Sequence, residues 1–201
     1  EAGQHPGPDY KFGWGVLNAA TAARVISENG TYTAIQEETF TGSTQSFTFN
    51  ASGAQPFEAT IVWTDPAGDV PGASLDPDDP ALVNDLDLKV SGGGSDFFPY
   101  KLSKSNPSAG ATTGMNHVDN VEKVFIQNSE PGQTYTIQIS NTGFISGGSQ
   151  AYSLIVRGLA DPAPNDLRVS RIFSLKKAGS GEALQLPVYA EIINEGSIVI
   201  N

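Results

Sequence analysis

The sequence predicts a mainly β protein: a jelly-roll or Greek-key antiparallel β-sandwich with one amino-terminal α-helix. Between residues 31 and 160, short runs alternate apolar and polar residues, and Gly, Asn, Ser and Pro separate these runs. About eight short runs with turn residues between them are typical of β-sandwiches and jelly rolls. Before residue 30 the apolar residues follow helical spacing instead, so a single helix precedes the strands.

The amino-terminal helix is predicted from an alanine-rich stretch with one apolar face. The apolar positions at helical spacing are Val16, Ala19, Ala20, Ala23 and Ile26. Alanine favours helix strongly, and Gly30 supplies the left-handed stop expected after the last turn. Nothing later in the sequence resembles a natural partner for this face. We therefore expect the helix to pack on a domain that lies outside this chain.

The strands are predicted from period-two alternation, which places apolar side chains on one face of a half-buried strand. The expected strands cover residues 31–38, 45–50, 57–64, 85–90, 97–102, 122–127, 134–140 and 151–157. Two connections, 65–83 and 103–121, are longer than hairpin loops. Long loops in a compact sandwich are often functional.

The tail begins with a linker by composition, residues 160–165, which read Ala-Asp-Pro-Ala-Pro-Asn. Further strands are expected at residues 167–172, 184–193 and 197–200. These few strands are too little for an independent sandwich. Either they begin a second module or they pair onto the first one.

Composition excludes several classes of function. The 201 residues carry 11 Lys and Arg against 22 Asp and Glu, a formal net charge of -11. Nucleic acids and anionic membranes attract clustered Lys and Arg, so neither is an expected partner. With no cysteine there is no disulfide and no thiolate metal site. No apolar run approaches the roughly 20 residues that span a bilayer, and the start at Glu1 suggests a piece of a longer secreted protein.

The segment 82–90 is the place where fold and chemistry are expected to meet. Leu86, Leu88 and Val90 alternate with Asp85, Asp87 and Lys89. Alternation of this kind predicts a strand with a core face and a carboxylate face exposed to solvent.

These carboxylates suggest a calcium site. Calcium takes six to eight oxygen ligands from carboxylates and carbonyls, usually on loops. The candidate metal ligands are Asp65, Asn84, Asp85, Asp87, Asn120 and Glu122. Their spacing is not that of an EF-hand, and the alternative is a solvated acidic loop that binds no metal.

Nucleophilic catalysis is not supported by the sequence. The two histidines, His5 and His117, are isolated from each other, and no Gly-x-Ser-x-Gly elbow is present. Two isolated histidines without cysteine also argue against a zinc site.

Among the aromatic residues, Trp63 is in phase with Ile61 and is expected in the core, whereas residues 97–100 offer a carbohydrate platform.

Several segments together resemble the carboxy-terminal region of secreted subtilisin-like serine proteases. The stretch from Pro8 to Ala20, with its Gly-x-Gly-x-x-Asn-Ala pattern, resembles the closing helix of their catalytic domain. The stretches Ile-Val-Trp-Thr-Asp-Pro, Leu-Val-Asn-Asp-Leu-Asp-Leu and Asp-Asn-Val-Glu resemble the β-sandwich that follows it. That sandwich is similar in architecture to the P-domain of kexin-like convertases, in which calcium is common.

The resemblance implies three parts. Residues 1–30 are the terminal helix segment of a catalytic domain, 31–160 a P-domain-like β-sandwich, and 161–201 a linker and the start of an immunoglobulin-like module. The catalytic Asp, His and Gly-Thr-Ser motifs of the family are absent, so no catalytic residue is carried over to this chain.

The function implied is that of a non-catalytic, secreted accessory domain. It is expected to stabilise the catalytic domain of its own protease and to help bind protein substrate. Two alternatives stay open: a module that binds glycans or surface polymers, and a structural spacer in an extracellular multidomain protein.

Overall fold

The computed structural model describes residues 5–70, 72–73, 75, 79–161, 167–174 and 188–194, the last two stretches as backbone only. The chain divides into two compact units, Glu1–Ala160 and Asp161–Asn201. The boundary falls at the linker that composition suggests.

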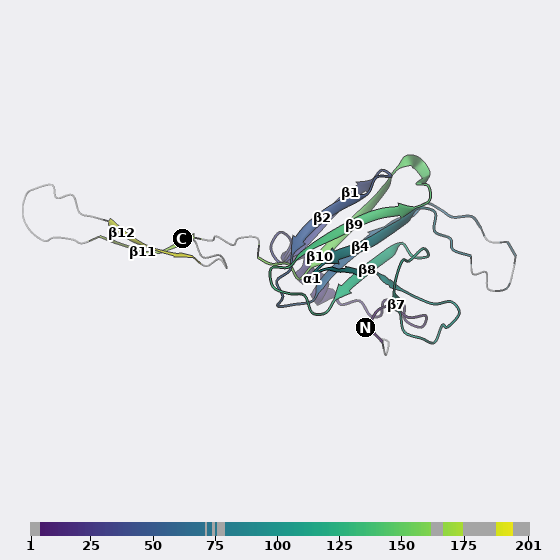
Figure 1. The fold of residues 1–201 in the computed structure, drawn as a ribbon, viewed down its shortest axis with the longest axis horizontal. Helices are drawn as coiled ribbons and strands as arrows, with labels where there is room; N and C mark the ends of the chain where they lie inside the picture. The colour runs from purple at the N-terminus through teal and green to yellow at the C-terminus, as the bar shows by residue number, and fades with distance from the viewer. Residues whose placement is uncertain are drawn as a thin grey trace, which may run out of the picture. The chain divides into compact units, whose positions relative to one another are not determined.

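The first unit is a β-sandwich of two four-stranded antiparallel sheets (Figure 1). One sheet has the order β1-β10-β3-β8, with strands Thr33–Phe40, Gln150–Arg157, Phe57–Trp63 and Val121–Ile126. The other has the order β2-β9-β4-β5, with strands Gln45–Asn50, Thr134–Thr142, Asp85–Gly92 and Ser95–Phe97. Apart from the β4–β5 hairpin, each connection between these eight strands crosses to the other sheet. This is the eight-stranded jelly roll that the sequence predicts.

The core lies between the two sheets, where the alternating apolar residues of both meet. Ile61, Leu88, Ile137 and Leu154 are each 0% exposed, and Trp63 is 3% exposed. Along β3 every second residue is buried, as the period-two pattern requires. Trp63 is therefore a core residue, as predicted, and is not a carbohydrate platform.

The helix is shorter than its sequence pattern suggests. Helix α1 spans Ala19–Ser27, and the Asn18 side chain caps it by accepting a hydrogen bond from the Thr21 amide at 3.0 Å. The preceding residues form a turn in which Asp9 Oδ1 accepts the Lys11 and Phe12 amides. Gly13 and Gly15 have positive φ, which ends any helical extension towards the amino terminus.

The single strand predicted at residues 97–102 is instead two. Strand β5 pairs with β4, whereas β6, Tyr100–Lys101, pairs with β7, Thr112–Thr113. Pro99 stands between them and has no N–H to continue a ladder. The chain therefore leaves the sandwich at this point and enters the long connection to β8.

The second unit contains one antiparallel pair, β11 (Leu167–Ser174) and β12 (Val188–Asn194), with an irregularity between Val169 and Arg171. The strand expected at residues 197–200 lies outside the described residues. The immunoglobulin-like character of this unit remains a prediction.

Candidate metal centre

Strand β4 has an open edge beside its acidic residues. Its partner β5 pairs only with Val90–Gly92, while β9 pairs with Asp85 through Ser91 on the other side. Among the strands that the structure describes, none therefore pairs on that side with the half of β4 that carries Asp85 and Asp87. Polar groups at an open edge are free to interact with side chains or ligands.

The acidic face of β4 is not the solvent face that alternation predicts. Asp85 is 16% exposed and Asp87 only 3%, although both lie opposite the core-facing Leu86 and Leu88. Thr142 of β9 donates its hydroxyl to Asp87 Oδ2 at 2.9 Å. The long connection between β6 and β8 brings His117 over the same face. The prediction of an exposed carboxylate face is therefore wrong for Asp87, because this loop covers it.

His117 completes a cluster of three potential metal ligands. Its Nδ1 atom lies 2.8 Å from Asp85 Oδ2 and 3.7 Å from Asp87 Oδ1. One ligand atom from each of the three residues lies within 4.8 Å of the others. Sequence reasoning set this histidine aside, because 32 residues separate it from Asp85 and nothing in its local sequence signals the contact.

Glu122 reaches the open edge from the opposite sheet. It is on β8 in phase with Val124 and Ile126 and is 0% exposed. Its Oε2 accepts the Leu88 amide at 2.6 Å, an N–H that belongs to the unpaired half of β4. The carboxylate thus bridges the two sheets next to Asp87.

Three buried carboxylate oxygens on these residues have no hydrogen-bond partner in the described part of the chain. They are Asp85 Oδ1, Asp87 Oδ1 and Glu122 Oε1, and they make up three of the five such side-chain atoms found among the described residues. Buried polar atoms are normally satisfied, so a group of unsatisfied ones calls for a ligand or a proton.

The pKa values reflect the same crowding of negative charge. Burial, together with the charges of Asp87, Asp85 and Asp119, raises the pKa of Glu122 to about 9, against the opposing effect of the Leu88 amide. Burial also raises the pKa of Asp85, with His117 opposing it, and that of Asp87, with Thr142 opposing it. A cation between these groups would favour their ionised forms.

Two other predicted ligands, Asp65 and Asn84, belong to a separate hydrogen-bonded network. Asp65 accepts the amides of Val83 and Asn84 at 2.6 and 2.8 Å. The Asn84 side chain is fully buried, accepts the Ser146 amide at 2.7 Å and donates to Gln150 Oε1 at 2.7 Å. This network fixes the chain where the long β3–β4 connection enters β4.

The last predicted ligand, Asn120, holds the end of β8 against β3. Its Nδ2 donates to the Trp63 carbonyl at 2.7 Å, and the Trp63 amide donates to the Asn120 carbonyl at 3.2 Å. Of the six predicted ligands, Asp85, Asp87 and Glu122 each keep a buried oxygen without a hydrogen-bond partner among the described residues, and Asp85 and Asp87 lie together in the cluster with His117. The structure places Asp65, Asn84 and Asn120 in structural hydrogen bonds.

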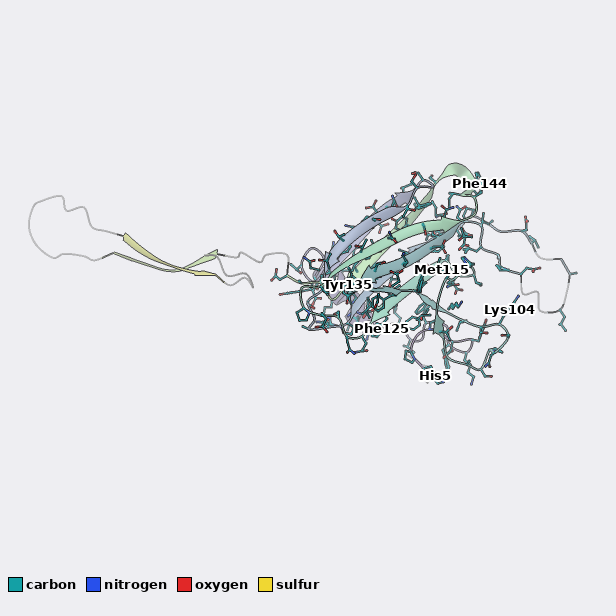
Figure 2. The ribbon with its side chains drawn as sticks, viewed as in Figure 1. His5, Lys104, Met115, Phe125, Tyr135 and Phe144 are labelled. Atoms are coloured by element: carbon teal, nitrogen blue, oxygen red, sulfur yellow. The ribbon has the colours of Figure 1, made fainter. Side chains whose placement is uncertain are left out.

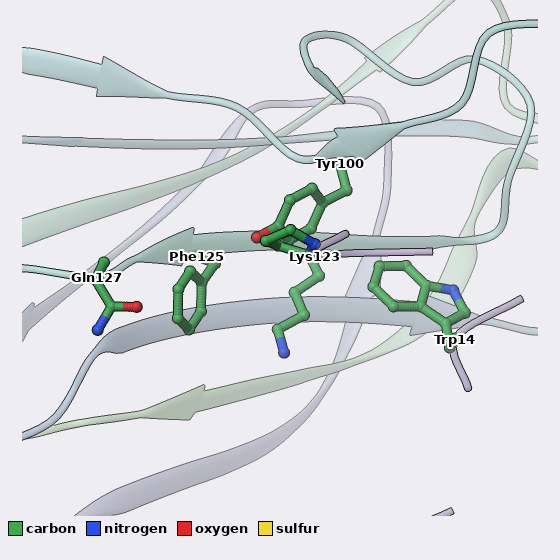
Figure 3. Close-up of a pocket in the computed structure, with 6 residues that line it drawn as sticks. Trp14, Tyr100, Lys123, Phe125 and Gln127 are labelled. Atoms are coloured by element: carbon green, nitrogen blue, oxygen red, sulfur yellow. The ribbon is translucent and has the colours of Figure 1, made fainter. Parts of the chain in front are cut away.

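A second candidate surface is a hollow of about 220 Å³ beside the amino-terminal segment (Figure 3). Its lining residues are Pro6, Trp14, Tyr100, Lys123, Phe125 and Gln127. Trp14 meets Tyr100 edge-on, with ring centroids 6.4 Å apart. The neighbouring Phe97 instead packs against Tyr135 next to the core, so only part of the predicted aromatic platform faces this hollow.

Comparison with known proteins adds little. No protein-family model matches the chain, and no curated protein matches it. Among solved structures, the crystal structure of Aeromonas hydrophila PliG, a periplasmic lysozyme inhibitor of g-type lysozyme, matches with 18% identity and a TM-score of 0.33, covering 71% of this chain and 91% of that chain. At that TM-score the likeness supports no conclusion about function.

Within the described part of the chain, no helix is long and apolar enough to cross a membrane.

Proposed function

We propose that this chain is the non-catalytic accessory region of a secreted subtilisin-like serine protease, in which a jelly-roll sandwich stabilises the catalytic domain and helps bind protein substrate. The proposal rests on the sequence resemblance of residues 8–158 and on one structural observation. That observation is the apolar surface that the amino-terminal segment leaves open.

Helix α1 buries none of its residues. Val16, Leu17 and Ile26 are 79, 84 and 68% exposed, and the helix meets the sandwich only through half-buried residues such as Thr21 and Val25. Three large apolar side chains exposed on one short segment are a feature that interaction sites share. A catalytic domain whose closing helix this segment supplies is the partner that fits the resemblance.

The proposal includes a divalent cation at the open edge of β4. Calcium is the ion that the resemblance implies, and Asp85, Asp87 and Glu122 offer carboxylate oxygens without protein partners. Such an ion would tie β4 to the β6–β8 connection and to the opposite sheet. It would stabilise the folded state because it binds that state only.

Complementation tests the proposal. A subtilisin-like catalytic domain that ends before its Gly-x-Gly-x-x-Asn-Ala helix is mixed with this chain, and sedimentation and the half-life of peptidase activity at raised temperature are measured. We expect a one-to-one complex with a longer half-life. Leu17→Glu and Ile26→Glu should weaken the complex, because each places a charge in the apolar contact.

Phe144→Glu is the matched control, since Phe144 is 83% exposed on the turn after β9 (Figure 2). It should leave the complex unchanged. Absence of any complex with the unaltered chain, or equal weakening by all three substitutions, would contradict the proposal.

The glycan-binding alternative has one observation in its favour, the aromatic hollow beside Trp14 and Tyr100. It predicts retention on polysaccharide gels that Tyr100→Ala abolishes. Retention without complex formation would favour this alternative over the protease accessory role.

A further inference from the structure

We propose that Asp85, Asp87 and His117 form a binding site for a divalent transition-metal ion, represented by Mn²⁺ and Zn²⁺, in preference to calcium. The inference deepens the proposed function, since it rests on the statement that a cation stabilises this end of the sandwich. It concerns which ion binds and through which atoms.

The geometry places three donors around one point. His117 Nδ1 lies 2.8 Å from Asp85 Oδ2 and 3.7 Å from Asp87 Oδ1. Metal–ligand bonds of about 2.1 Å set neighbouring donors about 3.0 Å apart in octahedral coordination and about 3.4 Å apart in tetrahedral coordination. The two separations from His117 Nδ1 fall around these values, and all three donors lie within 4.8 Å of one another, so the three residues are close enough to bind one ion.

The type of donor selects the ion. Sites that combine nitrogen and oxygen donors bind the first-row divalent ions from Mn²⁺ to Zn²⁺, and imidazole is a ligand of zinc, copper, iron and nickel in particular, whereas calcium binds oxygen. Calcium also needs six to eight ligands, and the oxygens of Asp65 and Asn84 already accept backbone amides. One nitrogen and two carboxylates suit an ion that accepts mixed donors and fewer protein ligands.

The residues around the cluster have the features of a supporting shell. Thr142 holds Asp87 Oδ2 and thereby leaves Oδ1, which has no hydrogen-bond partner among the described residues, on the side of His117. Asp87 is 3% exposed, so this free oxygen is shielded from bulk water. Hydrogen bonds to ligating carboxylates orient them for the metal.

Access and charge complete the site. The His117 side chain is 48% exposed, which gives an ion a path from solvent and room for water ligands. The buried Glu122 carboxyl group interacts electrostatically with both Asp85 and Asp87. A hydrogen-bonded His–Asp pair alone explains the contact at Asp85 but leaves the free oxygen of Asp87 without a role.

Calorimetric titration of the chelator-treated chain tests the proposal. Mn²⁺, Zn²⁺, Ca²⁺ and Mg²⁺ are titrated separately, and the ¹⁵N resonance of His117 Nδ1 is followed with Zn²⁺. We expect one equivalent of Mn²⁺ or Zn²⁺ to bind with a Kd about 10-fold or more below that of Ca²⁺, because only these ions gain from the nitrogen donor. The Nδ1 resonance should shift on binding.

Substitutions separate the three donors. His117→Ala should raise the Kd for Mn²⁺ and Zn²⁺ about 10-fold or more, because it removes the nitrogen donor, and leave weak Ca²⁺ binding unchanged. Asp87→Asn should abolish binding of every ion. His5→Ala is the matched control for adventitious histidine binding and should change nothing.

Tighter binding of Ca²⁺ than of both transition metals would overturn the proposal. So would unchanged binding in His117→Ala, or no binding of any ion. The complementation experiment above is independent of this result, because its substitutions lie outside the metal cluster, at Leu17, Ile26 and Phe144, and it needs no metal. Failure of the ion assignment and failure of the accessory role are therefore distinguishable.

Discussion

Two polar clusters lie at the same end of the sandwich, and they differ in how well they are satisfied. In the Asp65–Asn84 cluster, both side chains are hydrogen-bonded to other groups of the protein. In the cluster of Asp85, Asp87 and Glu122, each carboxylate keeps one buried oxygen without a partner among the described residues. The first cluster is complete as a structural element. The second needs a ligand or a proton, and we assign the metal to its Asp85 and Asp87 together with His117.

Removing the satisfied cluster should have the largest effect on stability. Asn84→Ala removes a fully buried side chain and leaves the Ser146 amide and Gln150 Oε1 without their partner. Unsatisfied buried groups cost about 1–3 kcal/mol each, so for these two groups we expect a loss of about 2–6 kcal/mol. Denaturant unfolding measures it. Added metal should still stabilise this variant. Loss of that stabilisation would show that the two clusters form one site.

Metal removal should act on the unsatisfied cluster alone. An ion present at a hundredfold excess over its Kd contributes about 2.7 kcal/mol, because it binds only the folded state. For a unit of this size, excess EDTA should therefore lower the Tm by roughly 5–10 °C. Asp87→Asn should remove this response while leaving the Tm in EDTA unchanged or higher. Equal Tm values with and without metal would show that neither cluster is stabilised by a metal ion.

The unsatisfied cluster should also make the metal-free protein sensitive to pH. The pKa of Glu122 is raised in the folded state to about 9 from 4.5, so the folded state holds a proton that the unfolded state releases between these values. The free energy of unfolding is then highest below about pH 4.5 and falls as the pH rises towards 9. Between pH 5.5 and 7, one proton accounts for at most about 2 kcal/mol.

Denaturant unfolding of the metal-free chain and of Glu122→Gln at several pH values checks this dependence. The difference in slope between the two proteins isolates Glu122 from the other acidic groups. Parallel slopes would show that Glu122 ionises in the folded protein as it does in the unfolded one. Saturating metal should flatten the slope of the unaltered chain, because the ion favours the charged carboxylate.

The smallest effect is expected for an exposed carboxylate on the same hairpin. Asp96 is hydrogen-bonded to Ser91 at 2.6 Å and lies 3.6 Å from Lys89, on the water-facing side of β5. Asp96→Asn should leave both the Tm and the metal response as they are, since a surface pair contributes little. A changed metal response here would mean that general negative charge, not the defined cluster, attracts the ion.

Much of the fold could be predicted from the sequence because its determinants are local. The period-two alternation at Leu86, Leu88 and Val90 correctly predicts the buried face of β4. The pattern fails where a single residue breaks the backbone ladder, as at Pro99, and where a turn replaces the first helical residues. These deviations follow from backbone hydrogen bonding, which hydrophobic periodicity does not describe.

The sequence by itself determined the jelly-roll class, the core face of each long strand and the acidic character of the 82–90 segment. Only the tertiary structure decided which polar side chains share a site. His117 and Glu122 reach β4 from segments 32 and 34 residues away, through connections that change sheets. Alternation fixes the face on which a side chain lies, whereas the sheet crossovers fix its neighbours. For that reason the sequence alone predicts six ligands, whereas the fold brings two of them, Asp85 and Asp87, together with His117.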